Sequence, residues 1–222
     1  FARGDCDAGF ICGLPYVQLT RSHPSPVELL AAPVLQGERY GGHPIYFSDV
    51  IVRRESPYQS FADLRGCVWA YNDRDSHSGY NVTRHTLVRM GETHGFFGRV
   101  VAAGFHQTAL RMVAGGQADA SAIDSQVLAI ELRDHPALAE RVRIITALGP
   151  ATIQPVVAAR HLSRSLKSDL SATLCAAGDE PELRSTLDYG FVDRFVPITD
   201  AHYDDIRAMV AEAEAAGFTT LR

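Results

Sequence analysis

The sequence predicts an α/β protein whose helices cover largely parallel β-sheets. Short runs of β-branched and other apolar residues alternate with helical patterns along most of the chain. Apolar residues make up 46% of the 222 residues, which is enough to build one large core or two small ones. The sequence contains no internal repeat and no low-complexity segment, which excludes a solenoid and a disordered arm.

The expected elements follow from the period of the apolar residues. We expect strands at Ala8–Cys12, Val27–Pro33, Tyr46–Arg53, Val68–Asn72, Val100–Ala103, Ala118–Ile123, Val142–Thr146 and Pro155–Ala159. We expect helices at Pro15–Arg21, Ser60–Leu64, Gly79–Met90, Thr108–Ala114, Ser125–Arg133, Ser163–Ala177, Pro181–Leu187 and Ala201–Ala216. The last helix carries an apolar stripe that we interpret as core packing rather than a partner-binding surface: Tyr203, Ile206, Met209, Val210 and Ala213.

The charge balance excludes several classes of partner. Charged residues make up 21% of the chain and the formal net charge is −5, so there is no basic surplus of the kind that nucleic acid or an anionic membrane requires. No apolar run approaches the roughly 18 residues of a membrane-spanning helix. We therefore expect neither nucleic-acid binding nor membrane insertion, and we expect no metal and no cofactor.

The chain begins at Phe1 rather than at a methionine, and Phe1–Cys6 has the pattern of a helix end that runs directly into the first strand. This segment has neither the charged region nor the apolar region of a signal peptide. We interpret it as the sign of a missing N-terminal piece of the first domain. A mature protein left by signal cleavage is the alternative.

The four cysteines are too few and too scattered for a disulfide framework, and no Cys-x-x-Cys pair suggests zinc. Cys12, Cys67 and Cys175 stand in apolar contexts, where we expect buried thiols. A strand from Asp7 to Cys12 would keep Cys6 and Cys12 apart.

A polar turn between a strand and a helix is the first candidate for a binding site. Ser76, His77, Ser78 and Gly79 follow the strand that ends near Asn72 and open the next helix. Such a turn directs backbone N–H groups and hydroxyls to one point, with the positive end of the helix dipole behind them. The sequence therefore predicts an anion-binding turn, and a serine that only caps the helix is the alternative.

Two further polar residues stand near the ends of neighbouring strands. His106 follows the expected strand Val100–Ala103, and Asp124 follows the expected strand Ala118–Ile123. In an open α/β sheet, ligands gather beyond the carboxyl ends of the strands. We therefore expect both side chains near the anion. The alternatives are a packing residue at a helix start for His106 and an N-cap for Asp124.

Together these fragments resemble the phosphate, phosphite and phosphonate substrate-binding proteins of ABC importers, a branch of the type 2 periplasmic binding-protein fold. The resemblance covers nearly the whole chain, and the order and spacing of its pieces are more specific than any one piece. The pieces are Asp7–Tyr16, Tyr46–Arg53, Phe61–Gly66, Asp73–Tyr80, Gly104–His106, Ala118–Ser125 and Gln154–Val157.

The resemblance implies which residues bind the ligand. The family's Ser-Thr-Ser-Gly turn corresponds to Ser76, His77, Ser78 and Gly79, which would supply hydroxyls and N–H groups to the oxyanion. His77 departs from the family pattern because it replaces a compact hydroxyl with a ring that can be cationic, so we expect a larger or more acidic ligand.

The resemblance also assigns residues around this turn. His106 corresponds to the family's ligand-binding histidine, and Asp124 corresponds to the acidic group that accepts a proton from the ligand. Tyr46 would contact the ligand from the first crossover strand. The loop after the opening strand would bring further residues to the cleft: Gly13, Pro15 and Tyr16.

The resemblance further implies two lobes with a cleft between them. We expect lobe one, N-terminally incomplete, at residues 1–47 plus 155–222 and lobe two at 48–154, with crossovers near Tyr46–Asp49 and Thr152–Pro155. The expected function is capture of a small phosphate-like or phosphonate-like oxyanion by hinge closure, as the binding component of an ABC uptake system. We expect an ABC permease as partner, a periplasmic or other extracytoplasmic location, a monomer, and no catalysis.

Two other functions use the same residues. A ligand-sensing module for a membrane receptor would share the cleft chemistry and differ only in its partner. An enzyme could use a nucleophile, base and orienting group drawn from Ser76, His77, Ser78, His106, Asp124 and Cys12. The sequence lacks a Gly-x-Ser-x-Gly elbow, and adjacent Ser-His-Ser side chains diverge, so binding is favoured over catalysis.

Overall fold

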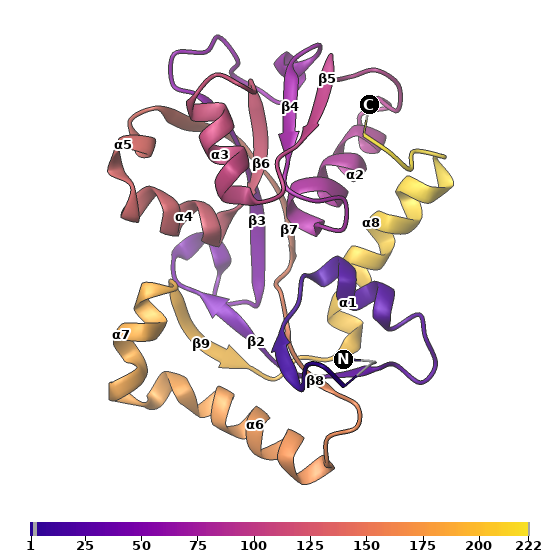
Figure 1. Ribbon diagram of the computed structural model, residues 1–222, viewed down its shortest axis with the longest axis vertical. Coiled ribbons are helices and arrows are strands. Elements are labelled where there is room, and N and C mark those ends of the chain that lie inside the picture. The colour runs from indigo at the N-terminus through magenta and orange to yellow at the C-terminus, as the bar shows by residue number, and fades with distance from the viewer. Residues whose placement is uncertain (2–3, 222) are drawn as a thin grey trace. The chain divides into compact units, whose positions relative to one another are not determined.

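The computed structural model describes residues 1 and 4–221 and divides the chain into two compact units (Figure 1). Unit one consists of Phe1–Tyr46 and Ala151–Arg207, and unit two of Phe47–Pro150 and Ala208–Arg222. The chain passes between the units in β3 (Ile45–Arg53), near the end of β7 (Val142–Thr152) and in α8 (Asp204–Ala215).

The third passage, in α8, corrects the expected lobe boundaries, which placed all of residues 155–222 in lobe one. Residues after Arg207 group with unit two because Phe218 and Leu221 belong to the same buried core as Trp69 and Leu87. The first part of α8 remains with unit one. The apolar stripe of this helix is buried as expected, with Tyr203, Ile206 and Ala213 fully inaccessible to solvent.

Unit one contains a sheet with the strand order β1 (Ala8–Phe10), β8 (Val156–Ala159), β2 (Val27–Leu35) and β9 (Val192–Val196). Its helices are α1 (Gly13–Leu19), α6 (Arg164–Ala176) and α7 (Pro181–Tyr189). Every neighbouring strand pair of this sheet is antiparallel, so the expectation of largely parallel sheets is wrong for unit one. The strand β9 was not predicted.

The reason for the antiparallel pairs lies in how two passes of the chain interleave. Strands β1 and β2 both run antiparallel to β8, so they run parallel to each other, and α1 connects them. Strands β8 and β9 are likewise parallel to each other, because both run antiparallel to β2. The alternation of strands and helices therefore correctly predicted pairs of parallel strands. In the sheet, however, the members of each parallel pair are not hydrogen-bonded to each other, because β8 lies between β1 and β2, and β2 lies between β8 and β9.

Unit two contains a sheet with the order β5 (Arg99–Ala102), β4 (Val68–Tyr71), β6 (Ala120–Asp124), β3 and β7. Strands β5, β4 and β6 are parallel, and β3 runs antiparallel to β6. The helices of this unit are α2 (Val82–Arg89), α3 (His106–Ala114), α4 (Ser125–Asp134) and the short α5 (Pro136–Ala139). The carboxyl ends of three parallel strands thus meet at one edge of the sheet.

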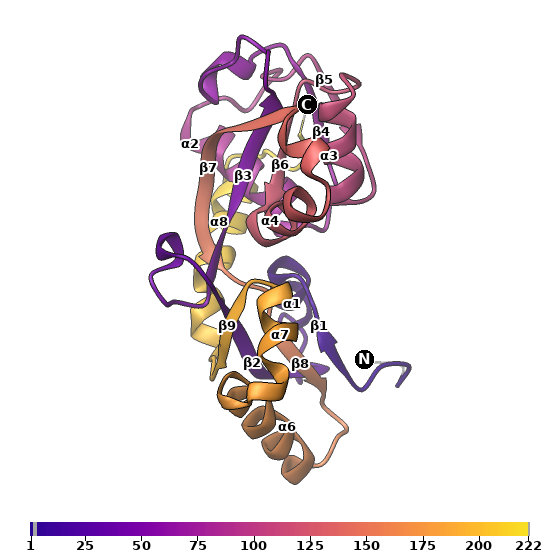
Figure 2. The same cartoon turned by 90° about the vertical axis from the view of Figure 1, so that its left-hand side faces the viewer.

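Alternation of side chains along these strands gives unit two a core on each face of its sheet. Val50, Val52, Trp69 and Tyr71 point to the core that contains α2, whereas the intervening Ile51 and Ala70 belong to the core on the other face. That second core contains Ala109, Leu110 and Val113 of α3 and Leu128 of α4. Figures 1 and 2 accordingly show α2 on one side of the sheet and α3 and α4 on the other.

Short helical turns complete the chain: 3₁₀ turns at Glu38–Tyr40, Ala62–Leu64, Ala177–Asp179 and Asp200–Tyr203, and a π-helical turn at His77–Asn81. All four cysteines are free thiols. Only Cys67 is fully buried, and burial raises the pKa of its thiol to about 12; Cys12 and Cys175, expected to be buried, are partly exposed.

Candidate functional site

The predicted anion-binding turn is a π-helical turn that joins β4 to α2. The N–H of Asn81 donates to the carbonyl of Ser76 at 3.1 Å, which is the wide spacing of a π turn. Such turns are rare and occur frequently at functional sites. Residues Ser76 to Asn81 are all buried. The turn stands at the carboxyl end of β4, between the parallel neighbours β5 and β6.

The two serines of this turn have different partners. Ser76 caps the turn, because its Oγ accepts a hydrogen bond from the N–H of Gly79 at 3.1 Å. Ser78 Oγ is hydrogen-bonded to His106 Nε2 at 2.9 Å. The two hydroxyl oxygens lie 3.5 Å apart. The capping role considered as the alternative therefore applies to Ser76, while Ser78 turns toward the next strand-to-helix connection.

His106 is the first residue of α3, and the fold brings it to the anion-binding turn as expected. Burial lowers the pKa of its ring to about 4, so the imidazole is neutral near pH 7. Its Nδ1 is buried and has no hydrogen-bond partner among the described residues. A buried polar atom without a partner is uncommon in folded proteins and marks a place where a further group can bind.

Gly79 is fixed by close packing rather than by an unusual backbone angle. A Cβ atom added to Gly79 would lie 1.8 Å from Asn72 Oδ1 and 3.2 Å from His106 Cε1. The same Asn72 Oδ1 is buried without a hydrogen-bond partner among the residues described. Asn72 was not predicted as a site residue. It directly follows β4, and a position at the end of a strand was the reason for selecting Asp124 in β6.

His77 corrects one expectation from the sequence. Its side chain is completely buried, and its Nδ1 is 3.2 Å from the amide Nδ2 of Asn81 one helical turn later. Burial, with a smaller contribution from His85, lowers the pKa of His77 to about 3. The ring is therefore neutral near pH 7, and a cationic histidine that selects a more acidic ligand is not what this fold provides.

Asp124 ends β6 and caps α4, as the alternative interpretation foresaw. Its Oδ1 accepts hydrogen bonds from the N–H groups of Gln126 at 2.9 Å and Val127 at 3.2 Å. The position beside the anion-binding turn follows from the sheet, since β6 pairs with β4. Proton acceptance from a ligand stays a prediction.

The expected residues of unit one have structural partners within that unit. Gly13 opens α1, and a Cβ atom there would lie 2.4 Å from Ile206 Cδ1, so its small size serves helix packing. Tyr16 donates its hydroxyl to Asp200 Oδ1 at 2.7 Å, and burial together with this carboxylate raises the pKa of its phenol well above the usual value. Tyr46 is buried in β3. Ligand contacts from Gly13, Tyr16 and Tyr46 stay predictions.

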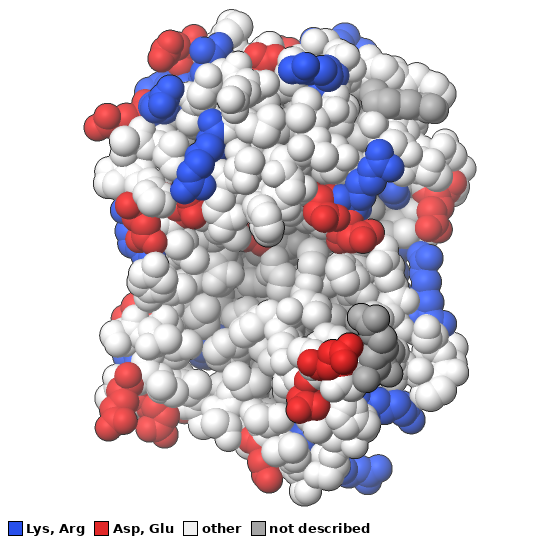
Figure 3. All heavy atoms as spheres, viewed as in Figure 1, with Lys and Arg blue, Asp and Glu red and all other residues white. Residues whose placement is uncertain are grey.

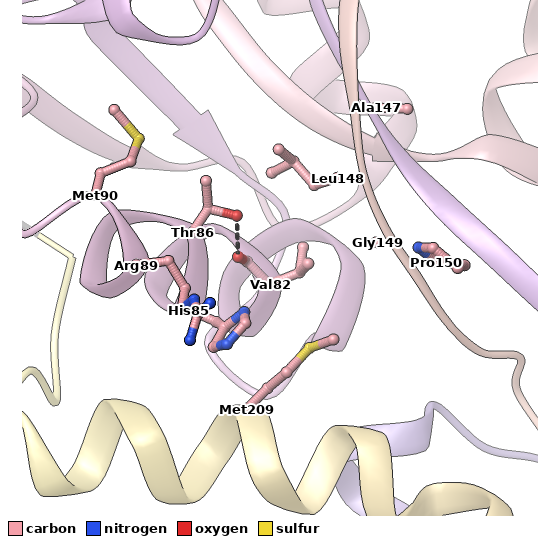
Figure 4. A pocket seen from close by; sticks show the side chains of 10 residues that line it. All are labelled: Val82, His85, Thr86, Arg89, Met90, Ala147, Leu148, Gly149, Pro150 and Met209. Carbon is pink, nitrogen blue, oxygen red and sulfur yellow. Dashed lines mark hydrogen bonds between the residues drawn. The ribbon is translucent and has the colours of Figure 1, made fainter.

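A separate hollow of about 360 Å³ lies elsewhere in unit two (Figure 4). It is lined by α2, by the end of β7 and by Met209 of α8. Two of its lining side chains, His85 and Arg89, lie within 4.0 Å of Glu212. None of the residues predicted for the oxyanion lines this hollow.

Charged side chains of both signs are mixed on the surface. On the face shown in Figure 3, lysine and arginine side chains are interspersed with aspartate and glutamate in each unit. Within the described residues, no three His, Cys, Asp or Glu side chains gather in a way that could hold a metal ion. In the same part of the chain, no helix is both long and apolar enough to cross a bilayer.

Solved structures share this fold at low sequence identity. A binding protein component of an ABC phosphonate transporter from Pseudomonas aeruginosa has a TM-score of 0.83 at 18% identity, over 100% of this chain and 73% of that chain. PhnD1 from Prochlorococcus marinus, in complex with methylphosphonate, has a TM-score of 0.78 at 17% identity, over 96% and 80%. XAC2383 from Xanthomonas citri, bound to ATP, has a TM-score of 0.73 at 18% identity, over 99% and 82%.

The sequence itself matches a family model, and the match extends over most of the chain. The model is described as the periplasmic substrate-binding protein of the phosphonate ABC transporter, and it matches residues 1–203. The fold of its relatives, the type 2 periplasmic binding-protein fold, is the one expected from the sequence. The chain therefore belongs to the family of periplasmic substrate-binding proteins of ABC phosphonate transporters.

Proposed function

We propose that this protein captures a small phosphonate-like or phosphate-like oxyanion for an ABC permease, and that the turn Ser76–Gly79 with His106 holds the phosphoryl oxygens. The observation that carries the proposal is the hydrogen bond between Ser78 Oγ and His106 Nε2 at 2.9 Å, next to two buried polar atoms without hydrogen-bond partners among the described residues, Asn72 Oδ1 and His106 Nδ1. The neutral hydroxyls supply hydrogen bonds without a full countercharge, and the neutral ring of His106 orients Ser78.

In this proposal the two serines donate their protons to the ligand. Ser76 Oγ already accepts the N–H of Gly79, and in the tautomer that this proposal assigns to His106 the Nε2–H donates to Ser78 Oγ. Each hydroxyl oxygen then accepts one hydrogen bond from the protein and keeps its own proton to donate to the ligand. Two such donors, beside the first N–H groups of a helix, favour an anion over a neutral ligand.

Asp124 sets the protonation state of the ligand in this proposal. A carboxylate beside a fully deprotonated oxyanion is repelled in a site that excludes water, whereas a ligand that retains an O–H can donate to it. Phosphate-like and phosphonate-like ligands retain such a proton near neutral pH, and sulfate does not. The site is therefore expected to refuse sulfate.

Family membership supports a permease as partner and an extracytoplasmic location. Binding followed by hinge closure at the segments that pass between the units would deliver the ligand unchanged. A sensing role would use the same capture step with a receptor in place of the permease.

Isothermal titration calorimetry with methylphosphonate, phosphate, phosphite and sulfate tests the proposal. We expect saturable one-to-one binding of at least one phosphorus oxyanion and none of sulfate. Phosphorus NMR of the same mixtures should show unchanged ligand after prolonged incubation, since capture involves no catalysis. Absence of binding by every phosphorus oxyanion, or turnover of any of them, would contradict the proposed function.

A further inference from the structure

We propose that Phe105 is a specificity-determining residue that packs against the organic substituent of the ligand, so that this protein prefers phosphonates with an apolar group to bare phosphate. The inference rests on the proposed function, because it places the ligand's phosphoryl group on the turn Ser76–Gly79. It concerns the organic substituent, which is the part of the ligand that this turn does not contact.

Phe105 stands at a position where its side chain has two local costs. It is the N-cap residue of α3, with an extended backbone (φ −138°, ψ 154°) and no side-chain capping hydrogen bond. Ser, Thr, Asp or Asn is strongly preferred there because its oxygen can bind a free helix N–H. The phenyl ring is also 70% exposed, the largest exposed fraction among the large apolar side chains of the described residues. Neither helix capping nor core packing explains a phenylalanine at position 105.

The fold places this residue beside the oxyanion site. The N–H of Ala103 donates to the carbonyl of Tyr71 at 2.8 Å, which aligns the end of β5 with the residue before Asn72. Gly104 then turns the chain through a left-handed backbone angle of +83°, and Phe105 follows. Its neighbour His106 contacts Ser78, and consecutive Cα atoms are only about 3.8 Å apart. The backbone of Phe105 is thus one residue from a side chain of the oxyanion site, and on this basis we place its ring beside a group attached to the bound phosphorus.

A residue that breaks local rules without a compensating contact is expected at functional sites. An apolar ring at the rim of a polar site gains little from phosphate, which presents only oxygen atoms. It gains from an alkyl or aryl substituent, which it removes from water, and most from an aromatic group, whose ring can pack against it. We therefore assign the ligand class as alkyl- or arylphosphonates rather than phosphate.

The experiment compares phosphate, methylphosphonate, butylphosphonate and phenylphosphonate by calorimetry, with the wild-type protein, Phe105→Ser and Tyr189→Ser. Tyr189 is a matched control, because it is an aromatic residue that is 61% exposed at the end of α7 in unit one. Serine at position 105 provides the missing helix cap, so the variant should fold and its Tm should rise by about 2–4 °C.

We expect Phe105→Ser to weaken butylphosphonate and phenylphosphonate binding about tenfold, the order of magnitude for loss of one aromatic contact, and to change phosphate affinity less than twofold. Tyr189→Ser should leave all four affinities unchanged. If the wild type binds phosphorus oxyanions but Phe105→Ser changes none of them, or all of them equally, the assignment of Phe105 is wrong and the proposed function stands. If no phosphorus oxyanion binds the wild type, both the assignment of Phe105 and the proposed function are wrong.

Discussion

Ser78 Oγ and His106 Nε2 are hydrogen-bonded at 2.9 Å, although the two residues belong to different strand-to-helix connections. Ser78 lies after β4 and His106 after β5, and these strands are parallel neighbours. The sheet therefore brings a hydroxyl and a neutral imidazole to one point. This pairing underlies the predictions about the site.

Ser78→Ala should weaken oxyanion binding more than the loss of one hydroxyl alone would suggest. The change removes a donor to the ligand and also leaves His106 Nε2 without its partner, while Nδ1 already has none among the described residues. A hydrogen bond to a charged ligand contributes about 1.5–3 kcal/mol, so we expect affinity to fall at least tenfold. Calorimetry measures the effect.

Ser25→Ala is a suitable control, since among the described residues that hydroxyl bonds to the backbone of Val27 alone, within unit one. It should leave oxyanion affinity unchanged. Equal affinities for the wild type and Ser78→Ala would remove the turn from the binding site.

Gly79→Ala should disrupt the turn sterically. The new methyl group would overlap Asn72 Oδ1 and press on His106 Cε1, so the side chain of Asn72, whose Oδ1 is buried, would have to move. Overpacking of this kind costs about 1–3 kcal/mol, and we expect both the free energy of unfolding and the ligand affinity to fall.

The steric cause can be separated from a general effect of alanine. The double variant Asn72→Ala with Gly79→Ala removes the overlapping atom and should recover much of the stability. Gly9→Ala, at a partly buried glycine where an added Cβ would meet no atom within 4 Å, should cost little. Chemical denaturation measures all of these variants, and a double variant no more stable than Gly79→Ala alone would contradict the steric explanation.

The geometry of the candidate site was partly predictable from local sequence, because a polar turn between a buried strand and a helix is a local pattern. Ser76 and Ser78 were found in this way, and so was the N-cap role of Asp124. The pairing of Ser78 with His106 depends on which strands are neighbours, which no local pattern gives. The burial that keeps His77 neutral is likewise a property of the assembled core, and the sequence alone suggested a ring that can be charged.

The fold shows the same limit. Most strands and helices were predicted within a few residues, because their apolar periods are clear. Strand β9 was missed because Asp193 and Arg194 interrupt its apolar residues. The interleaved order of unit one and the passage of α8 into unit two could not be predicted, since both depend on contacts between distant segments such as Phe218 with the core of Trp69.

The two buried histidines should make the protein less stable in mild acid. Burial lowers the pKa of His77 to about 3 and that of His106 to about 4, while a histidine in the unfolded chain titrates near 6.5. As the pH falls from about 6.5 toward 4, the unfolded state takes up protons that the folded state does not. The free energy of unfolding should therefore fall by up to about 1.4 kcal/mol per pH unit for each histidine.

Urea denaturation at several pH values measures this slope. His77→Gln should reduce it, because glutamine does not titrate, whereas replacement of the exposed His43 by glutamine controls for the loss of a histidine as such. A slope that is the same in the wild type and in His77→Gln would mean that His77 is not held neutral by the fold.

Asp124→Asn should relax the discrimination against sulfate while leaving the fold intact. Asparagine is as good an N-cap as aspartate, so its side-chain oxygen can still accept from the N–H groups of Gln126 and Val127, and the stability of α4 should change little. The variant removes the negative charge and provides a donor, so an oxyanion without a proton no longer meets a carboxylate. We expect measurable sulfate binding by the variant and none by the wild type.

The pH dependence separates this selection from a simple charge effect. Wild-type affinity for a phosphonate should fall as the pH rises through the last ionisation of the ligand, because the proton that Asp124 accepts is then lost. In Asp124→Asn this fall should be much smaller. Calorimetric titrations across that ionisation, with thermal unfolding to verify the cap, measure both effects. If the wild type binds sulfate as tightly as phosphonate, or if both proteins show the same pH profile, Asp124 acts only as the cap of α4.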